Sequence, residues 1–326
     1  MSTAVVTGGR GFAGSWLAKR LLEGGYEVIS VDRESSRTSG LALQGLDADV
    51  ADETADLRDR ERVQGLLASN DVDVVFHLAA QPIVGDANRS PVPTFEANIA
   101  GTWELMEACR LAGVNRVVVA SSDKAYGPHD ELPYDEGAAL QPIFPYDVSK
   151  AAADLIARSY WHTFGLPVAV TRFANIYGGG DLNFSRLIPE TVSAVLDGRS
   201  PQIRSDGSPE RDFLYVEDVA DAYVALAEAL ERGDGAGEAF NAGWGAPNSV
   251  REIVQLVCEI AGGDTEPDFQ GSGNPDGEID RQYLLSDKIR SITGWEPKVA
   301  LREGIWRTVQ WYRDHPEARA GAVDER

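Results

Sequence analysis

The chain has 326 residues, 43% of them hydrophobic, which is enough to bury a large core in two domains or in one large α/β unit. Its 52 acidic and 30 basic residues give a formal net charge of −22, which argues against nucleic acid or an anionic membrane as a partner, because both require a basic surface. No apolar stretch approaches the length of a membrane span and no cleavable signal is evident, so a cytoplasmic location is expected.

Cysteine and histidine are too sparse to suggest a metal centre or a disulfide. Cys109 and Cys258 each lie within an apolar helical pattern, where a thiol usually packs as a small core residue. The four histidines show no ligand spacing, and no Cys/His cluster accompanies them. We therefore expect no metal site and no catalytic cysteine.

Short apolar runs alternate with helix-length amphipathic segments through the first half of the chain. The runs expected to be strands are 3–7, 27–32, 71–79, 116–121 and 167–173, and the segments expected to be helices are 12–25, 61–69 and 94–113. This alternation is typical of βαβ units on a parallel sheet, and the nearly all-apolar strands indicate that both faces are covered. The predicted fold class is α/β with a doubly wound parallel sheet.

The composition changes after residue 173. Loops rich in Gly, Pro and Asn separate shorter helices there, which indicates a smaller, loop-rich substrate lobe. The segments 217–231 and 238–243 are expected to return to the first domain, and the polar chain from about Pro316 is expected to fray. The predicted boundaries are 1–173 with about 217–243 for the first domain, 174–216 with 244–315 for the second, and 316–326 for the frayed tail.

The first predicted strand leads into the sequence TGGRGFAG at 7–14. Gly8, Gly11 and Gly14 permit a tight turn, close approach of a pyrophosphate to the backbone and close packing of the next helix, whose N-terminus attracts phosphate. Because Asp32 ends the following strand, these features together predict a dinucleotide site. A carboxylate there binds the ribose hydroxyls and repels a 2′-phosphate, which favours NAD over NADP, although the neighbouring guanidinium of Arg33 could tolerate that phosphate.

Two later segments are expected to contact the cofactor as well. Asp56 and Leu57, in ADLRD, could flank the adenine, and HLAAQ at 77–81 ends a strand in small residues that suit close approach of the backbone. The expected cofactor residues of the first domain are Gly8, Gly11, Phe12, Gly14, Asp32, Arg33, Asp56, Leu57, Leu78, Ala79 and Ala80, together with Tyr146 and Lys150.

Tyr146 and Lys150 stand four residues apart in PYDVSKAAADL, a spacing that places both side chains on one face of a helix. A lysine ammonium near a phenol favours the phenolate and lowers its pKa, so Tyr146 could serve as a base near neutral pH. The pair lies downstream of the dinucleotide motif and of a strand that ends beside Ser122. Asp123 and Lys124 follow directly, and they are either a charged turn or part of an active site.

Several segments match one known family in chain order: TGGRGFAG, ADLRD, HLAAQ, YDVSK, RFANIYGGGD, RDFLYVEDVADAY and ITGWEPKVALREGI. The chain thereby resembles the extended short-chain dehydrogenases/reductases of the nucleotide-sugar epimerase/dehydratase group. The resemblance covers nearly the whole chain and implies a Rossmann-type NAD domain with a smaller C-terminal nucleotide-sugar domain. HLAAQPIV, SPVPTFEANIAGT, SSDK and NIYGGGDLNFSRLIP look most like the CDP-glucose 4,6-dehydratases, whereas AYG after the Asp-Lys pair is familiar from other members, which leaves the nucleotide open.

The resemblance also implies roles for the candidate catalytic residues. Ser122 would contact the C4 oxygen of the sugar, Tyr146 would be the base in C4 oxidation, and Lys150 would support Tyr146 and bind the cofactor ribose. Asp123 would protonate the departing C6 hydroxyl. Lys124 would take the C5 proton or would orient a water molecule or the sugar.

The same resemblance places a nucleoside-diphosphate sugar in the second domain. Arg211 and Arg281 are candidate diphosphate clamps, since guanidinium matches phosphate oxygens, but they could equally be surface arginines paired with Asp212 and Asp280. The expected substrate-binding residues are Gln81, Asn175, Asn183, Arg186, Arg211 and Arg281.

Three functions remain open at this stage. The first is NAD-dependent 4,6-dehydration of a nucleoside-diphosphate hexose, and the second is 4-epimerisation with the same Ser/Tyr/Lys set, for which an acid at Asp123 has no use. The third is a dinucleotide-sensing binding protein, which would have no reason to keep both Tyr146 and Lys150. The resemblance further implies a homodimer paired through helices near 91–112 and 146–164.

Overall fold

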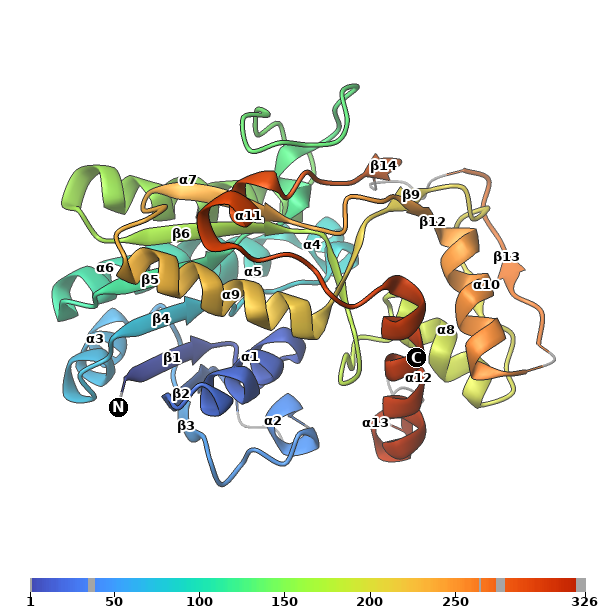
Figure 1. Cartoon of the computed structure of the whole chain (residues 1–326), viewed down its shortest axis with the longest axis horizontal. Coiled ribbons are helices and arrows are strands. Elements are labelled where there is room, and N and C mark those ends of the chain that lie inside the picture. The colour runs from blue at the N-terminus through green and yellow to red at the C-terminus, as the bar shows by residue number, and fades with distance from the viewer. Residues whose placement is uncertain (1, 35–38, 264, 274–278, 321–326) are drawn as a thin grey trace.

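Within residues 2–34, 39–263, 265–273 and 279–320, which the computed structural model describes, seven parallel strands form one central sheet (Figure 1). Its strands, in spatial order, are β11 (Glu238–Ala242), β6 (Val168–Phe173), β5 (Arg116–Ala120), β4 (Val74–His77), β1 (Thr3–Thr7), β2 (Glu27–Asp32) and β3 (Ala51–Thr54). The strand order reverses between β1 and β4, and ligands of such sheets bind outside the carboxyl ends of the strands at that point.

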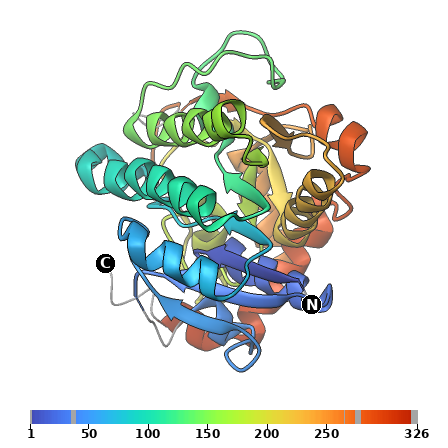
Figure 2. The same ribbon diagram turned by 90° about the vertical axis from the view of Figure 1, so that its left-hand side faces the viewer.

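Helices cover both faces of the sheet (Figures 1 and 2). On β1, Ala4 and Val6 join one buried cluster and Val5 joins the other, because successive strand side chains point to opposite faces. One face packs against α3 (Arg60–Ser69), α6 (Gly101–Ala112) and α7 (Pro145–Phe164), and the other packs against α1 (Phe12–Glu23), α9 (Val216–Glu231) and α11 (Asp287–Thr293). The prediction of a doubly wound α/β fold is confirmed.

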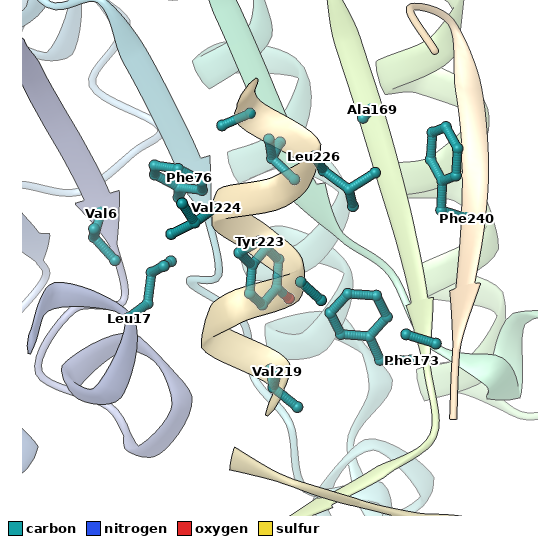
Figure 3. Close-up of a cluster of buried hydrophobic side chains, with 14 of the residues drawn as sticks. Val6, Leu17, Phe76, Ala169, Phe173, Val219, Tyr223, Val224, Leu226 and Phe240 are labelled. Atoms are coloured by element: carbon teal, nitrogen blue, oxygen red, sulfur yellow. The ribbon is translucent and has the colours of Figure 1, made fainter. Parts of the chain in front are cut away.

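Helix α9 fills the centre of one of these layers (Figure 3). The ring of Tyr223 lies 6.4 Å from that of Phe76 on β4 and 5.1 Å from that of Phe173 on β6, measured between ring centroids. Its hydroxyl accepts a hydrogen bond from Thr171 Oγ1 at 3.3 Å, so the polar end of the ring is satisfied. A buried aromatic side chain of this kind contributes about 1.5–3 kcal/mol to stability. The segment from 216 to 242 thus supplies both a covering helix and the edge strand β11.

Short elements connect the strands on the cofactor-facing side. They are α2 (Gly40–Leu43), α4 (Val84–Arg89), α5 (Pro91–Phe95), the π-helical segment η1 (Glu96–Ala100) and the 3₁₀ turn η2 (Asp123–Tyr126). The segments α5, η1 and α6 follow one another without a break, and a π segment inside a helix often marks a functional position.

A second, smaller core lies beyond the sheet, toward the right of Figure 1. Val192, Val257 and Val309 are fully buried in it, and they come from α8 (Leu187–Leu196), α10 (Val250–Ala261) and α12 (Leu301–Asp314). Its strand pairs are β7 (Asn175–Tyr177) with β10 (Phe213–Tyr215), and β8 (Gln202–Ile203) with β13 (Asp268–Phe269), while β9 (Glu210–Arg211) lies between β12 (Asn248–Ser249) and β14 (Arg281–Gln282). The division of the chain into two domains stays a prediction.

The polar end of the described chain differs from the expectation of a frayed tail. Pro316–Ala320 form helix α13, in which Ala318 is buried, Arg319 Nε donates to Tyr312 O at 3.2 Å and the Arg319 guanidinium pairs with Asp197. These contacts hold a segment whose composition alone suggests fraying, whereas 321–326 lie outside the described residues. Among the helices that the structure describes, none is both long enough and apolar enough to cross a membrane.

Candidate active site

The glycine turn between β1 and α1 lies against the end of β4. Gly8 has φ +77°, and a Cβ added there would stand 2.8 Å from Ala79 N. A Cβ on Gly14 would stand only 2.1 Å from Gly8 O, so this helix can approach the turn only without a side chain. Gly11 is the N-cap of α1 and provides no side-chain cap, which suits the binding of phosphate at the helix N-terminus. The turn therefore fits the pyrophosphate of a dinucleotide.

We expect Gly14→Ala to weaken NAD binding by at least tenfold and to lower the free energy of unfolding by about 1–3 kcal/mol, because the added methyl group would displace the turn. Isothermal titration with NAD and thermal unfolding measure the two effects. Gly65→Ala is a matched control, because a Cβ at this position on α3 meets no atom within 4 Å. Equal NAD affinity in the two variants would contradict this account of the turn.

Asp32 ends β2 and lies beside the glycine turn. Its Oδ2 accepts hydrogen bonds from Arg10 N at 3.0 Å and from Ser30 Oγ at 3.1 Å. Burial raises the pKa of Asp32, and the bond from the Arg10 amide opposes that shift. Arg10 itself is buried and pairs with Asp52 at 2.8 Å, so it ties the turn to β3. The sequence analysis missed this role of Arg10 because glycine was the only residue type it weighed in the motif.

The other residues expected at the cofactor lie around this turn in different settings. Asp56 forms a two-pronged ion pair with Arg58, which lowers the pKa of Asp56, and Leu57 is buried in the core. Arg33 is exposed. It stays a prediction that Asp56 and Leu57 flank the adenine and that Arg33 could tolerate a 2′-phosphate. Phe12 and Leu78 are half-buried, as are Ala79 and Ala80.

A buried histidine fixes the end of β4 next to the turn. Ala79 N donates to Thr7 Oγ1 at 3.3 Å, and Thr7 Oγ1 lies 2.8 Å from His77 Nδ1. His77 Nε2 lies 3.0 Å from Thr102 Oγ1, whose hydroxyl donates to Asn98 O at 2.6 Å. These directions require a neutral imidazole with its proton on Nε2. Burial, reinforced by the charge of Lys150, lowers the pKa of His77 to about 3.

The carboxyl end of β5 carries the predicted catalytic turn. Ser122 is the N-cap of η2: its Oγ accepts from Lys124 N at 3.2 Å and donates to Asp123 Oδ1 at 3.0 Å. A hydrogen bond with the same hydroxyl lowers the pKa of Tyr146, so Ser122 lies next to that phenol. The structure thus brings together Ser122, Asp123, Lys124 and Tyr146 at one strand end.

Asp123 is 2% exposed, although aspartate is rarely buried without a partner. Its Oδ2 has no hydrogen-bond partner in the part of the chain that the structure describes. Burial raises the pKa of Asp123, while the charges of Lys124 and Arg211 and the bond from Ser122 lower it. A carboxyl group held in this way favours its protonated form. This arrangement differs from a solvated charged turn.

Tyr146 and Lys150 lie near the start of α7, and their environments differ from the expectation. Burial raises the pKa of Tyr146 to about 12, and the nearby Arg186 guanidinium offsets part of that rise. Lys150 is buried, its Nζ donates to Ala120 O at 2.9 Å, and desolvation lowers its pKa to about 8. The expected lowering of the Tyr146 pKa by Lys150 is therefore wrong for this arrangement, because burial dominates at both residues.

The two arginines expected to clamp a diphosphate lie on opposite sides of β9 and β14. Arg211 is buried, and its guanidinium donates to Glu210 O at 2.9 Å and to Asp280 O at 2.8 Å. Its positive charge lowers the pKa of Asp123. Arg281 is exposed and pairs with Glu210 at 2.5 Å. Arg211 thus faces the catalytic turn, whereas Arg281 belongs to the outer surface.

The remaining substrate candidates lie on strand β7, on the segment before α8 and on the loop after β4. Asn175 Nδ2 donates to Asp212 O at 3.3 Å, Asn183 Oδ1 accepts from Ser185 N at 3.1 Å, and Arg186 pairs with Asp181 at 3.0 Å. Of these, Arg186 is the residue whose positive charge lowers the pKa of Tyr146. The Asn98 side chain binds the backbone of Gln81 twice, since its Oδ1 accepts from Gln81 N at 2.7 Å and its Nδ2 donates to Gln81 O at 3.1 Å, and Nδ2 also donates to Ser149 Oγ at 2.9 Å on α7.

Two buried residues at this site were missed from the sequence. Asp212 is fully buried, accepts hydrogen bonds from Trp244 N and Gly245 N at 3.0 Å each, and has a pKa raised to about 6 by burial. Gln282 is also fully buried, and its Oε1 accepts from Lys124 Nζ at 3.4 Å. In the described ranges, no group of three or more His, Cys, Asp and Glu side chains is arranged to hold a metal ion.

Comparison with known proteins shows the family to which the chain belongs. A family model for the NAD dependent epimerase/dehydratase family matches residues 4–243. The chain is 35% identical over 320 residues to UDP-glucose 4-epimerase of Mycolicibacterium smegmatis, covering 95% of this chain and 98% of that protein. It is 34% identical over 323 residues to dTDP-D-glucose 4,6-dehydratase of Mus musculus, covering 95% and 88%. A crystal structure of a dTDP-glucose 4,6-dehydratase double mutant from Streptomyces venezuelae, with NAD bound, superimposes with a TM-score of 0.87 at 32% identity, over 96% of this chain and 98% of that one.

The switch point of the sheet, the glycine turn and Asp32 define a dinucleotide-dependent α/β enzyme of the extended short-chain dehydrogenase/reductase type. The chain belongs to the NAD-dependent epimerase/dehydratase family, and its cofactor is NAD. The likeness to CDP-glucose dehydratases stays a prediction, since the two named relatives carry UDP and dTDP in their names.

Proposed function

We propose that the protein is a 4,6-dehydratase of a nucleoside-diphosphate hexose, which yields the 4-keto-6-deoxy sugar nucleotide. The observation that carries the proposal is Asp123, a buried carboxyl group with one oxygen unpartnered among the described residues, directly beside Ser122 and Lys124. Dehydration needs a neutral carboxylic acid at neutral pH to protonate the leaving hydroxyl group, and burial favours that form.

The first step is oxidation of the sugar at C4. Ser122 and Tyr146 bind the C4 hydroxyl, and Tyr146 takes its proton. The raised pKa of Tyr146 means that this base must be assisted by nearby positive charge, which the Arg186 guanidinium supplies, and Lys150 is assigned to the ribose of the bound cofactor. NAD, when bound, accepts hydride from C4 and later returns it to C6.

The second step is loss of water across C5 and C6. The C4 ketone makes the C5 proton acidic, and Lys124, on the same turn as Asp123, removes it directly or through a water molecule. Asp123 donates its proton to the C6 hydroxyl, which leaves as water. Of the two protons that Tyr146 and Lys124 took, one adds to C5 as hydride returns to C6 and the other restores the acid form of Asp123, so that the net change is the loss of one water.

The diphosphate of the substrate requires local positive charge, because the whole chain is acidic. We assign this role to the buried guanidinium of Arg211 and, at the outer rim, to Arg281. Asn175 is assigned to the sugar or diphosphate, and Asn183, Arg186 and Gln81 are assigned to the remaining contacts with the nucleotide sugar.

A 4-epimerase is the second candidate, and the 35% identity to the mycobacterial UDP-glucose 4-epimerase favours it. An epimerase would use Ser122, Tyr146, Lys150 and NAD but would have no step for an acid at Asp123. Incubation with UDP-, GDP-, CDP- and dTDP-hexoses, followed by mass spectrometry of the products, tests the two functions. Loss of one water supports dehydration, and unchanged mass with a changed C4 configuration supports epimerisation.

We also propose that the protein forms a homodimer through α5, α6 and α7, which lie on one side of the molecule (Figure 2). Large apolar side chains on these helices are exposed: Val92 by 60%, Trp103 by 45%, Leu155 by 55% and Phe164 by 55%. Such a surface suits a second copy of the same chain, since paired helices would cover it.

Leu155→Arg is expected to convert the dimer to a monomer, because a buried unpaired charge at the centre of the interface is strongly unfavourable. Sedimentation velocity at micromolar concentration measures the mass. Trp306→Arg, which changes an exposed apolar residue on α12, should leave the dimer intact. A native chain that sediments as a monomer would refute the proposed interface.

A further inference from the structure

Gln282 lies at the inner side of the strand pair β9–β14. It stands opposite Arg211 in the parallel register, and Asp212 N donates to Gln282 O at 3.0 Å. Because strand side chains alternate, Arg281 points outward to Glu210 while Gln282 and Arg211 are buried toward the catalytic turn. Strand β14 thus brings a neutral amide to Lys124.

The orientation of this amide follows from its partner. Lys124 Nζ donates to Gln282 Oε1 at 3.4 Å, and an ammonium group can only donate, so Oε1 must face Lys124 and Nε2 must point elsewhere. Nε2 is buried and meets no acceptor at hydrogen-bonding geometry in the described chain. The Tyr134 phenol, which donates to Gly127 O at 2.7 Å, is close enough for the amide to lower its pKa, but Nε2 does not reach its oxygen at hydrogen-bonding geometry.

Asp123 Oδ2 is a second unpartnered buried atom, on the residue next to Lys124 in the chain. Native proteins rarely keep a buried donor and a buried acceptor unpaired, because each costs free energy that an apolar side chain of similar size would avoid. Two such atoms near one lysine therefore indicate a ligand group that forms a hydrogen bond with each of them. The oxygen of this group would accept from an amide and would receive a proton from an acid.

We propose that Gln282 is a specificity-determining residue: its Nε2 donates a hydrogen bond to the C6 hydroxyl oxygen of the hexose while its Oε1 holds Lys124 beside the C5–C6 bond. The inference rests on the proposed function for the presence of a nucleoside-diphosphate hexose at this turn. It adds that the enzyme recognises the hydroxymethyl group itself, so a pentose that lacks C6 forfeits this contact.

The test compares two sugar nucleotides that differ only at that group. Titration calorimetry of the NAD-loaded enzyme measures the affinities for UDP-glucose and UDP-xylose, or for the dTDP pair if only that nucleotide binds. In Gln282→Met, which fills a similar volume without a donor, we expect affinity for the hexose to fall about tenfold and affinity for the pentose to change by less than about threefold. Equal changes for both sugars, or no change for the hexose, would overturn the inference.

A second variant addresses the lysine and guards against a folding defect. Gln282→Glu keeps the shape and an oxygen that can pair with Lys124 but removes the Nε2 donor, so it should lose the hexose preference. A hexose preference that is kept in Gln282→Glu would overturn the role of Nε2 as the donor. Arg281→Met, on the outer side of the same strand, serves as a comparison that should affect hexose and pentose alike.

These measurements separate the inference from the function on which it rests. If the protein epimerises C4 and releases no water, the product mass reveals that failure, while the hexose-to-pentose affinity ratio still reports on Gln282. If dehydration occurs and the ratio is the same in Gln282→Met and in the native enzyme, the proposed function stands and the inference about Gln282 fails.

Discussion

Asp123→Asn is expected to lower the rate of water loss by about 10²–10⁴-fold while C4 oxidation persists, because asparagine keeps the shape of the buried side chain but has no acidic proton. Rapid mixing with substrate should therefore still produce the NADH absorbance, and the keto sugar should accumulate without elimination. The variant should unfold at the native temperature or above it, because it removes the cost of burying a carboxyl group whose pKa is raised.

Asp218→Asn is the matched control. Asp218 is also buried, and its carboxylate accepts hydrogen bonds from Lys298 N and Val299 N at 3.0 Å each, far from the catalytic turn in the sequence. This control should lose stability and keep turnover. Full turnover in Asp123→Asn would reduce Asp123 to a turn residue and would leave epimerisation as the better account.

The acid role also predicts a pH dependence with a definite sign. Burial raises the pKa of Asp123, so its proton is retained to a higher pH than in an exposed aspartate. Elimination should therefore fall as the pH rises through this pKa, and the fall should be absent from the residual rate of Asp123→Asn. A rate of the native enzyme that rises across the same range would contradict the assignment.

Tyr146→Phe is expected to abolish C4 oxidation, with a loss of at least 10²–10⁴-fold in turnover and no NADH absorbance on mixing, because phenylalanine has no hydroxyl group to take the C4 proton beside Ser122. Affinity for the sugar nucleotide should change only a few fold. Tyr160→Phe, on the same helix α7, changes an aromatic hydroxyl away from the turn and should keep full activity. Substantial NADH formation in Tyr146→Phe would show that another group is the base.

The parts of the site that local sequence determines were predictable. The glycine turn and Asp32 follow from a spacing of residues within one βαβ unit, and the sheet follows from alternating apolar runs. Tyr146 and Lys150 share a helix face because of their spacing alone. Such patterns carry their own geometry, so the structure needs no distant contact to realise them.

The parts that depend on distant contacts were not predictable. Gln282 contacts Lys124, which lies 158 positions away in the sequence. A strand of two residues is also too short for its alternation to show that Gln282 is the buried residue and Arg281 the exposed one. The predicted direction of the Tyr146 pKa shift was wrong for a similar reason, since burial is a property of the assembled fold. Composition also hid the packing of α13, whose anchors are one buried alanine and one arginine.

The central claim is that hydride moves from C4 to C6 with loss of water, and one labelling measurement tests it most directly. The enzyme is incubated with UDP-glucose or dTDP-glucose that carries deuterium at C4, and the product is examined by mass spectrometry and NMR. Dehydration predicts a product lighter by one water with the deuterium at C6. A product of unchanged mass that keeps the deuterium at C4 with inverted configuration would contradict the account and would identify an epimerase.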